Sequence, residues 1–173
     1  MDKVKKEILL KKTIINFVKN QACFDLQFRR DVKHKRTNKP VYYSWKAQFI
    51  LMGKYEDEDL IREIQKILNC GRLHFSAKNQ IRYSVQSLDD LYQKVIPFLR
   101  GLKLSKNKKQ DFEWWSKAVE ILFENKGKTI KEWKKQDFLE LMEIQKTMQK
   151  YKAKKGQSQK WLSQAELLAD TLP

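Results

Sequence analysis

The stretch that decides the fold spans residues 14–28 and reads IINFVKNQACFDLQF. Its first part completes a helical pattern over residues 5–20. The side chains that this pattern places near one side of the helix are Ile8, Leu9, Thr13, Ile15, Phe17 and Val18. From Cys23 the period changes to two, because apolar residues from Phe24 to Phe28 alternate with polar ones. The stretch therefore predicts a helix that runs directly into a strand.

A second alternating run follows a polar and basic turn at residues 30–40. Its apolar side is predicted to carry Tyr43, Trp45, Ala47, Phe49 and Leu51, and its other side Tyr42, Ser44, Lys46, Gln48 and Ile50. Such alternation is typical of a strand with one buried face and one face in solvent. The two runs together predict a long hairpin with one apolar face and one polar, cationic face.

The remaining chain continues the same order of elements. Residues 57–69 have helical spacing, and Gly71 is expected to stop that helix. Residues 72–76 and 80–85 alternate around a turn at 77–79, and a helix capped by Ser87 follows, which Pro97 should kink or end. A capping box at 129–132 is expected to open a helical region through about residue 150. The predicted fold class is α+β, a four-stranded antiparallel sheet with helices packed on one face.

Length and charge restrict the function. The chain has 173 residues, enough for one domain with a substantial core. We predict a nucleic-acid-binding domain over residues 1–150, followed by a basic connector and a short C-terminal helix over 151–173. Lys and Arg number 37 against 21 acidic residues, which gives a formal charge of +16. This excess favours a polyanionic partner, because neutralising phosphates releases condensed counterions.

The cysteines and histidines do not form a recognised metal motif. Cys23 and Cys70 are far apart, and with His34 and His74 they follow no zinc-finger spacing. The sequence has no apolar run near the ~18 residues of a membrane span, and its N-terminus lacks the apolar core of a secretory signal. We expect an intracellular protein, either organellar (mitochondrion or chloroplast) or from a bacterial cytoplasm.

The helix-to-strand join resembles the signature helix of the LAGLIDADG homing endonucleases. Two further fragments are similar to that family: the glycine turn at 68–73, and the lysine-rich connector at 106–115 after Pro97. The resemblance covers roughly residues 8–150. It implies a saddle-shaped sheet that lies along the major groove, with two signature helices packed side by side. A single signature is similar to the homodimeric members, and it implies a dimer interface or a paired subunit at Ile14, Ile15, Asn16 and Val18.

The chain departs from the family where the chemistry lies. The family ends its signature helix with an acidic residue that holds a divalent metal, and here that position is Gln21. An amide oxygen is a poorer Mg²⁺ ligand than a carboxylate. Lys19 replaces the first acid of the signature, and Asn16 and Ala22 replace its two glycines. We therefore predict no intact catalytic residue and no cofactor, with Mg²⁺ only if the chain is an active endonuclease.

The polar strand positions, the basic turn and the basic connector are the predicted nucleic-acid contacts, since Arg, Lys and Gln pair with base edges and phosphates. These residues are Gln27, Arg29, Arg30, Lys33, Lys35, Arg36, Lys39, Tyr42, Ser44, Lys46, Gln48, Arg72, His74, Ser76, Lys78, Arg82, Ser84, Lys106, Lys108 and Lys109. Lys106 and Lys108 also match the family's accessory basic residues near the cleaved phosphate. Asp25 is interpreted as a salt-bridge partner or a cytosine contact rather than a replacement metal ligand.

Three functions remain open from the sequence. The first is a LAGLIDADG protein that binds DNA or structured RNA without cutting it, as a maturase or as a component of a ribonucleoprotein assembly. The second is a Mg²⁺-dependent homing endonuclease that cuts or nicks specific DNA sequences, alone or paired with an intact subunit. The third is a non-catalytic subunit that binds an acidic protein. The sequence does not separate DNA from RNA.

Overall fold

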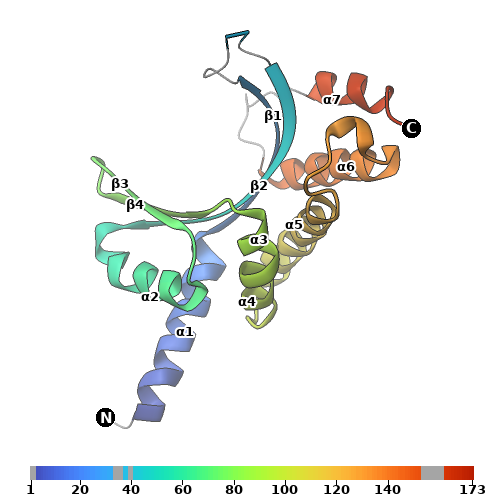
Figure 1. Cartoon of the computed structure of the whole chain (residues 1–173). Coiled ribbons are helices and arrows are strands. Elements are labelled where there is room, and N and C mark those ends of the chain that lie inside the picture. Colours follow the sequence, from blue (N-terminus) through green and yellow to red (C-terminus); the bar gives the residue numbers. More distant parts are fainter. Residues whose placement is uncertain (1–2, 33–36, 39–40, 153–161) are drawn as a thin grey trace. The chain divides into compact units, whose positions relative to one another are not determined.

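The four-stranded antiparallel sheet predicted from the sequence is confirmed in the computed structural model, which describes residues 3–32, 37–38, 41–152 and 162–173 (Figure 1). The strand order is β1 (Ala22–Val32), β2 (Val41–Lys54), β4 (Gln80–Val85) and β3 (Arg72–Ser76). The chain forms two compact units. The first comprises residues 1–25 and 48–113, and the second comprises residues 26–47 and 114–173.

The helix-to-strand join has the predicted form. Helix α1 (Lys3–Gln21) ends at Gln21, and β1 begins at the next residue, Ala22. On the buried side of the join, Phe24 packs its ring 6.0 Å from Phe49 and 5.7 Å from Phe112. This packing anchors the start of β1 in the first unit and leaves Gln21 exposed.

In the first unit, β2 and β4 bury apolar side chains, whereas Leu73 of β3 is half-buried and Phe75 is exposed. Leu51 of β2 and Leu73 of β3 both lie opposite Tyr83 of β4 in the antiparallel register. Helix α2 (Glu58–Leu68) lies beneath the β3–β4 hairpin in Figure 1 and follows a short 3-10 turn, η1 (Tyr55–Asp57). Its buried residues are Ile61, Ile64 and Leu68. The opposite side of these strands carries the polar residues.

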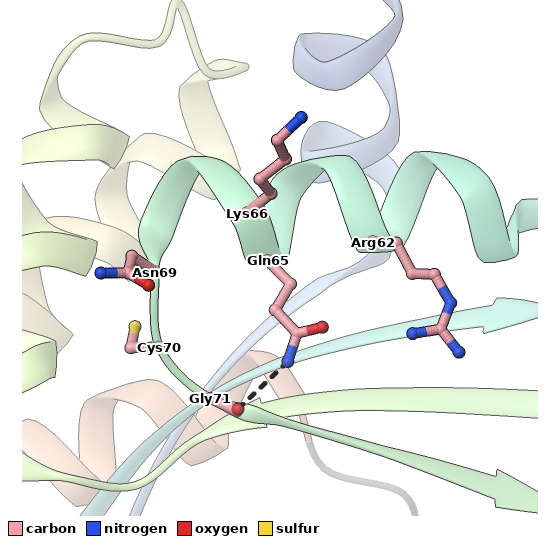
Figure 2. A pocket seen from close by; sticks show the side chains of 6 residues that line it. All are labelled: Arg62, Gln65, Lys66, Asn69, Cys70 and Gly71. Atoms are coloured by element: carbon pink, nitrogen blue, oxygen red, sulfur yellow. Dashed lines mark hydrogen bonds between the residues drawn. The ribbon is translucent and has the colours of Figure 1, made fainter.

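The end of α2 depends on two left-handed residues. Asn69, with a φ of 47°, directly follows the helix, and Gly71, with a φ of 80°, leads into β3. The predicted stop at Gly71 thus lies slightly beyond the true helix end. A Cβ atom at Gly71 would lie 2.6 Å from the Tyr83 ring, so this position requires glycine for space as well as for conformation. Gln65 donates a hydrogen bond of 3.2 Å to the Gly71 carbonyl (Figure 2).

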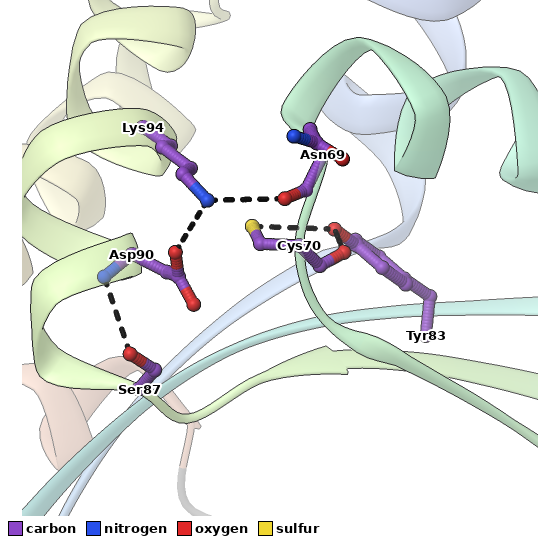
Figure 3. Close-up of polar contacts among 6 residues, drawn as sticks. All are labelled: Asn69, Cys70, Tyr83, Ser87, Asp90 and Lys94. Atoms are coloured by element: carbon purple, nitrogen blue, oxygen red, sulfur yellow. Dashed lines mark hydrogen bonds and ion pairs between the residues drawn. The ribbon is translucent and has the colours of Figure 1, made fainter.

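A polar network joins this turn to the helix after β4. Ser87 accepts a hydrogen bond from the Asp90 backbone N–H and so caps α3 (Leu88–Asp90), as predicted. Lys94 contacts the Asp90 carboxylate at 2.7 Å and donates to the Asn69 carbonyl at 3.0 Å (Figure 3). The hydrogen bond from Lys94 lowers the pKa of Asp90. These contacts fasten α3 to the end of α2.

Pro97 does not end the helical run that begins with α3. A π-helical segment, η2 (Leu91–Val95), leads into α4 (Ile96–Arg100), and Pro97 occupies its first turn. Proline is tolerated in a first turn because its missing N–H would have no intrahelical acceptor there. The sequence predicted that Pro97 would kink or end the helix. The wider π turn instead lets the helical run continue past Pro97.

The second unit is built around an aromatic cluster. The Phe138 ring lies 5.7 Å from Phe28 on β1, 5.7 Å from Trp45 on β2 and 6.2 Å from Trp133. Phe138 belongs to α6 (Lys135–Lys152), which follows α5 (Lys106–Glu124). The cluster packs the apolar side of the strands in this unit against α6.

The capping box at residues 129–132 caps a shorter element than predicted. The Thr129 backbone N–H donates to the Glu132 carboxylate at 2.6 Å, but the capped element is only the 3-10 turn η3 (Ile130–Glu132). Trp133 is extended, so α6 begins later, at Lys135.

Helix α7 (Leu162–Ala169) belongs to the same unit as α6, and Lys146 lies 3.8 Å from Glu166. A domain boundary at residue 150 stays a prediction.

Candidate nucleic-acid interface

The polar side of the hairpin in the first unit presents cations in a regular pattern. In the antiparallel register Arg72 lies opposite Ser84, and His74 lies opposite Arg82. Arg82 also pairs with Met52 of β2, so it lies between β3 and β2. Arg72 and His74 are exposed, whereas Arg82 and Ser84 are half-buried. The structure thus brings these predicted contact residues together on neighbouring strands.

A hydrogen-bonded chain holds Arg82 in place. Gln48 donates from its amide nitrogen to the Asp25 carboxylate at 2.8 Å. Its amide oxygen accepts from Arg82 at 3.1 Å and from Gln86 at 3.3 Å. Since Asp25 only accepts when ionised, it fixes the orientation of the Gln48 amide and turns the oxygen toward Arg82. Asp25 therefore acts as a positioning residue for the guanidinium.

The second unit presents its own set of polar strand residues. Gln27 and Arg29 on β1 and Lys46 on β2 are exposed. Ser44 is half-buried and donates a hydrogen bond of 3.1 Å to the Asp31 carboxylate. The remaining predicted residues described in this unit, Arg30 and Tyr42, are exposed. The alternation predicted for β1 and β2 is therefore observed at these positions, but Ile50, predicted on the polar side of β2, is buried.

Two polar residues, one on β1 and one directly after β4, were not predicted as contacts. Gln86 joins the Gln48 cluster, and Asp31 binds Ser44. A signal for both was present in the sequence, because Gln86 continues the alternation of Arg82 and Ser84, and Asp31 continues that of Gln27 and Arg29. The acids make the polar side of each unit's strands less uniformly cationic than expected, and each orders a side chain of its own unit, Asp25 in the first and Asp31 in the second.

Other predicted contacts lie at the hairpin tip and on α5. Lys78 is exposed in the β3–β4 turn, and the Ser76 carbonyl accepts a hydrogen bond from Tyr55 at 2.6 Å. Lys106 and Lys109 are exposed, and Lys109 lies 3.8 Å from Glu113. The predicted contacts Lys33, Lys35, Arg36 and Lys39 lie outside the described residues, as does His34.

The polar side of the first unit contains a hollow of about 450 Å³. Its lining includes Arg72, Ser84, Gln86, Ser87 and Asp90. A second, shallower hollow of about 460 Å³ lies at the end of α2, with Arg62 and Lys66 among its lining (Figure 2). The first hollow belongs to the candidate interface because it includes two polar strand positions of β4 and β3.

Lys108 reaches the end of the signature helix. Its ammonium group donates a hydrogen bond of 2.6 Å to the carbonyl of Ala22, the residue directly after Gln21. Lys19, in the last turn of α1, adds a second cation to this helix end. Lys108, predicted as an accessory basic residue near the cleaved phosphate, thus contacts the join between α1 and β1, and that role stays a prediction.

The divalent metal that the resemblance implies does not fit the residues at this join. Gln21 offers a neutral amide, and the Ala22 carbonyl already accepts from an ammonium group. Mg²⁺ sites in proteins depend on carboxylate oxygens. Within the described ranges there is no group of three or more His, Cys, Asp or Glu side chains that could hold a metal ion.

The predicted helix interface needs a correction. Ile14 is only 3% exposed and Val18 is 0% exposed within a single chain, so neither is available to a second copy. Ile15 is half-buried and Asn16 is exposed. The sequence predicted all four residues as interface. An apolar pattern does not distinguish a side chain buried in the chain's own core from one that faces a partner.

The tryptophans that could stack on bases are mostly core residues. Trp45, Trp115 and Trp133 are buried, and Trp114 is half-buried. Trp161 lies outside the described residues. Base stacking by the buried indoles is therefore excluded in this conformation.

The two cysteines are free thiols. Burial raises the pKa of the Cys70 thiol, which contacts the Tyr83 hydroxyl at 4.0 Å (Figure 3). The same hydroxyl donates to the Cys70 carbonyl at 2.9 Å, so this pair closes the turn into β3.

Among the residues that the structure describes, no helix is long and apolar enough to cross a membrane.

Sequence comparison places this architecture among known proteins. The family model described as LAGLIDADG endonuclease matches residues 14–119. A relative from Mycosarcoma maydis, the probable intron-encoded DNA endonuclease 1, is 30% identical over 61 residues, which are 35% of this chain and 23% of the relative. The chain therefore spans less than a quarter of that relative.

Solved structures with the same fold include several homing endonucleases. I-TnaI matches with a TM-score of 0.64 and 15% identity, over 92% of this chain and 97% of that chain. The group I intron-encoded I-CeuI, complexed with DNA, matches with a TM-score of 0.68 and 17% identity, over 87% and 69%. The meganuclease I-AabMI, bound to uncleaved DNA, matches with a TM-score of 0.57 and 22% identity, over 78% and 42%. At these identities the likeness concerns the fold.

Proposed function

Because the chain belongs to the LAGLIDADG endonuclease family, we propose that it binds nucleic acid through the polar side chains of its strands and does not cut it. The observation that carries this proposal is a contrast within the chain. The strands carry the cations Arg29, Lys46, Arg72 and Arg82, whereas the family's acidic position at the end of α1 is the neutral Gln21. The cations favour binding to phosphates, and without a carboxylate this position lacks the charge that would hold a catalytic metal.

The ordering of Arg82 supports a specific contact rather than a diffuse charge. An arginine guanidinium presents its donors in a fixed fork that matches guanine O6 and N7 or a phosphate. The Asp25–Gln48 pair holds this fork in place before any partner arrives. A preorganised side chain loses less conformational entropy on binding than a mobile one.

We propose a role like that of a maturase or of a component of a ribonucleoprotein assembly. A protein that no longer needs to cut DNA does not need the carboxylate at position 21, but it still needs its phosphate contacts. DNA and structured RNA are both compatible with the strand residues. The names of the relatives concern DNA, so a DNA duplex is one arm of the test and a structured RNA is the other.

The proposal is tested by competition. Purified protein should bind a labelled random-sequence duplex, and its affinity should fall steeply as salt rises. Intact cellular nucleic acid should displace the label, and the same material digested to mononucleotides should not. Displacement by a nuclease-treated, protein-containing extract alone would instead favour an acidic protein partner.

We also propose that α1 pairs with another signature helix. Val4 and Ile8 are 58% and 50% exposed, and they share a helical stripe with the half-buried Ile15, because they are spaced four and seven residues apart. A helix with an exposed apolar stripe buries it against a partner. The partner is a second copy of this chain or a related subunit with an intact acid, and the second case would allow one strand to be cut.

The change Ile15→Glu is expected to shift a dimer to a monomer in sedimentation velocity, because it places a charge within the apolar stripe. Thr13→Glu, on an exposed position of the same helix, is the matched control and should leave the distribution unchanged. A wild-type protein that remains monomeric at high concentration would contradict self-pairing and leave the related subunit to be tested by mixing.

A further inference from the structure

We propose that the Lys108 ammonium takes the place of the divalent cation at the join between α1 and β1, so that this chain holds a phosphate group there without metal. This inference rests on the proposed nucleic-acid binding and assigns the chemistry of one contact in it. The residues that occupy the join do not fit the divalent metal that the family implies.

The Lys108 ammonium group lies at the join itself. Lys108 lies 86 positions along the chain from Ala22, yet its Nζ atom lies 2.6 Å from the Ala22 carbonyl oxygen. The distance is short for an N–H···O contact, as expected of a charge-assisted hydrogen bond. Lys108 is also half-buried, unlike its exposed neighbours Lys106 and Lys109. Its charge is therefore fixed at the helix end rather than distributed over a mobile side chain.

The charge at the end of α1 favours a cation. The C-terminal end of a helix carries a partial negative charge from its unpaired carbonyl groups, which favours a cation. In α1 this end has no acidic side chain, since its last residues are Lys19, Asn20 and Gln21. The cations Lys108 and Lys19 serve the helix end instead. A divalent ion placed at the same carbonyl would meet the ammonium group at close range and be repelled.

The ammonium group has more hydrogen-bond donors than its contact with Ala22 uses. It carries three N–H donors, and the contact with Ala22 uses one of them. A lysine can therefore bind a phosphate oxygen while it stays bound to the carbonyl. Such a point charge provides electrostatic binding, but it supplies neither a metal-bound hydroxide nor a metal ligand for a leaving oxygen. The substitution thus agrees with binding in the absence of cleavage.

Two measurements test the inference on the full chain. The first is the affinity for a random-sequence DNA duplex and for a double-stranded RNA of equal length, in EDTA and in Mg²⁺ at matched ionic strength. The wild-type affinity should not rise in the Mg²⁺ buffer, because no metal is needed to hold the phosphate at this join. Lys108→Met should weaken binding about tenfold and reduce the salt slope by about one phosphate contact. Lys108→Arg should keep most of the affinity.

The matched control is Lys103→Met, which removes the same charge from an exposed position outside the join. It should weaken binding less than Lys108→Met does. Thermal unfolding of every variant shows whether the loss of the Ala22 hydrogen bond has damaged the fold. Should Lys108→Met fail to fold, the metal dependence of the wild type and the Lys108→Arg affinity still decide the question.

The second measurement is Mn²⁺ binding to the protein alone, followed by electron paramagnetic resonance. Gln21→Asp should bind Mn²⁺ poorly, and the double change Gln21→Asp with Lys108→Met should bind it at least about tenfold more tightly. Equal Mn²⁺ affinity with and without Lys108 would overturn the inference, as would a wild-type affinity for duplex that rises with Mg²⁺. A protein that binds neither duplex nor RNA in any buffer would overturn the proposed function itself.

Discussion

Charge reversal of Arg29, Lys46 and Arg82 together is expected to weaken nucleic-acid binding roughly a hundredfold or more at moderate salt, since a lost arginine or lysine contact costs about 1–3 kcal/mol. Arg29 and Lys46 are exposed on β1 and β2 of the second unit, and Arg82 is held on β4 of the first. The slope of log affinity against log salt should also become shallower, because fewer counterions are released. Fluorescence anisotropy over a salt series measures both quantities.

The matched control reverses three lysines away from the strands, namely Lys66, Lys131 and Lys134, all of them exposed. It changes the net charge by the same amount but leaves the strand side chains intact. A triple variant of the strands that binds no more weakly than this control would show that the strands are not the site. Any loss would then be a general effect of net charge.

Arg82 allows a finer test within the same series. Asp25→Asn removes the charge from the acceptor that orients Gln48, while Arg82 itself is kept. If the network orders the guanidinium for binding, the affinity of this variant for nucleic acid should lie between the affinities of the wild type and the triple variant. Its salt slope should resemble that of the wild type, because no phosphate contact is removed.

The protein alone is expected to show no Mg²⁺-dependent cleavage of the nucleic acid that it binds. Cleavage in this family depends on a divalent ion that stabilises the charge developing on the phosphate, and Gln21 contributes no charge to hold one. Incubation of the complex with Mg²⁺ should yield no more product than the same incubation of Gln21→Ala. Denaturing gels with each strand labelled separately detect single-strand and double-strand cuts alike.

Gln21→Asp is the informative variant for the rest of the site, because it restores the carboxylate and changes nothing else. Without metal we expect it to bind nucleic acid more weakly than the wild type, because the new carboxylate lies at the join where Lys108 is proposed to hold a phosphate. Any cleavage that it gains in Mg²⁺ would show that the surrounding residues survived. Metal-dependent double-strand cuts by the unmodified protein, abolished in Gln21→Ala, would make the chain an endonuclease and contradict the proposal. Cuts that arise only after mixing with an intact subunit would support an endonuclease that is active only as a pair.

The fold and part of the candidate site could be predicted from local patterns. The change of period at Cys23 predicted the join between α1 and β1, and the alternation from Tyr42 to Phe49 predicted which strand residues face the polar side. Both predictions succeed for the same reason. The spacing of apolar residues along a helix or strand directly reflects which side that element buries.

Helix ends were predicted less well, because local signals compete there. Thr129 and Glu132 form the expected capping box, but the extended Trp133 limits it to one 3-10 turn. Pro97 lies at the start of a helical segment rather than at its end, since a π-helical turn precedes it. In both cases the local motif was correct, and the length of the element was decided by the packing of residues beyond it.

The sequence by itself determined the order of the elements, the polar side of the strands and the loss of the acid at position 21, since each of these is a property of one short stretch. Only the tertiary structure decided that Lys108 serves the Ala22 carbonyl and that Asp25 orients Gln48 toward Arg82. It also decided that Ile14 and Val18 belong to the chain's own core while Ile15 remains partly exposed. These contacts join residues distant in the chain, and no local periodicity specifies which partner a side chain meets after the elements have packed.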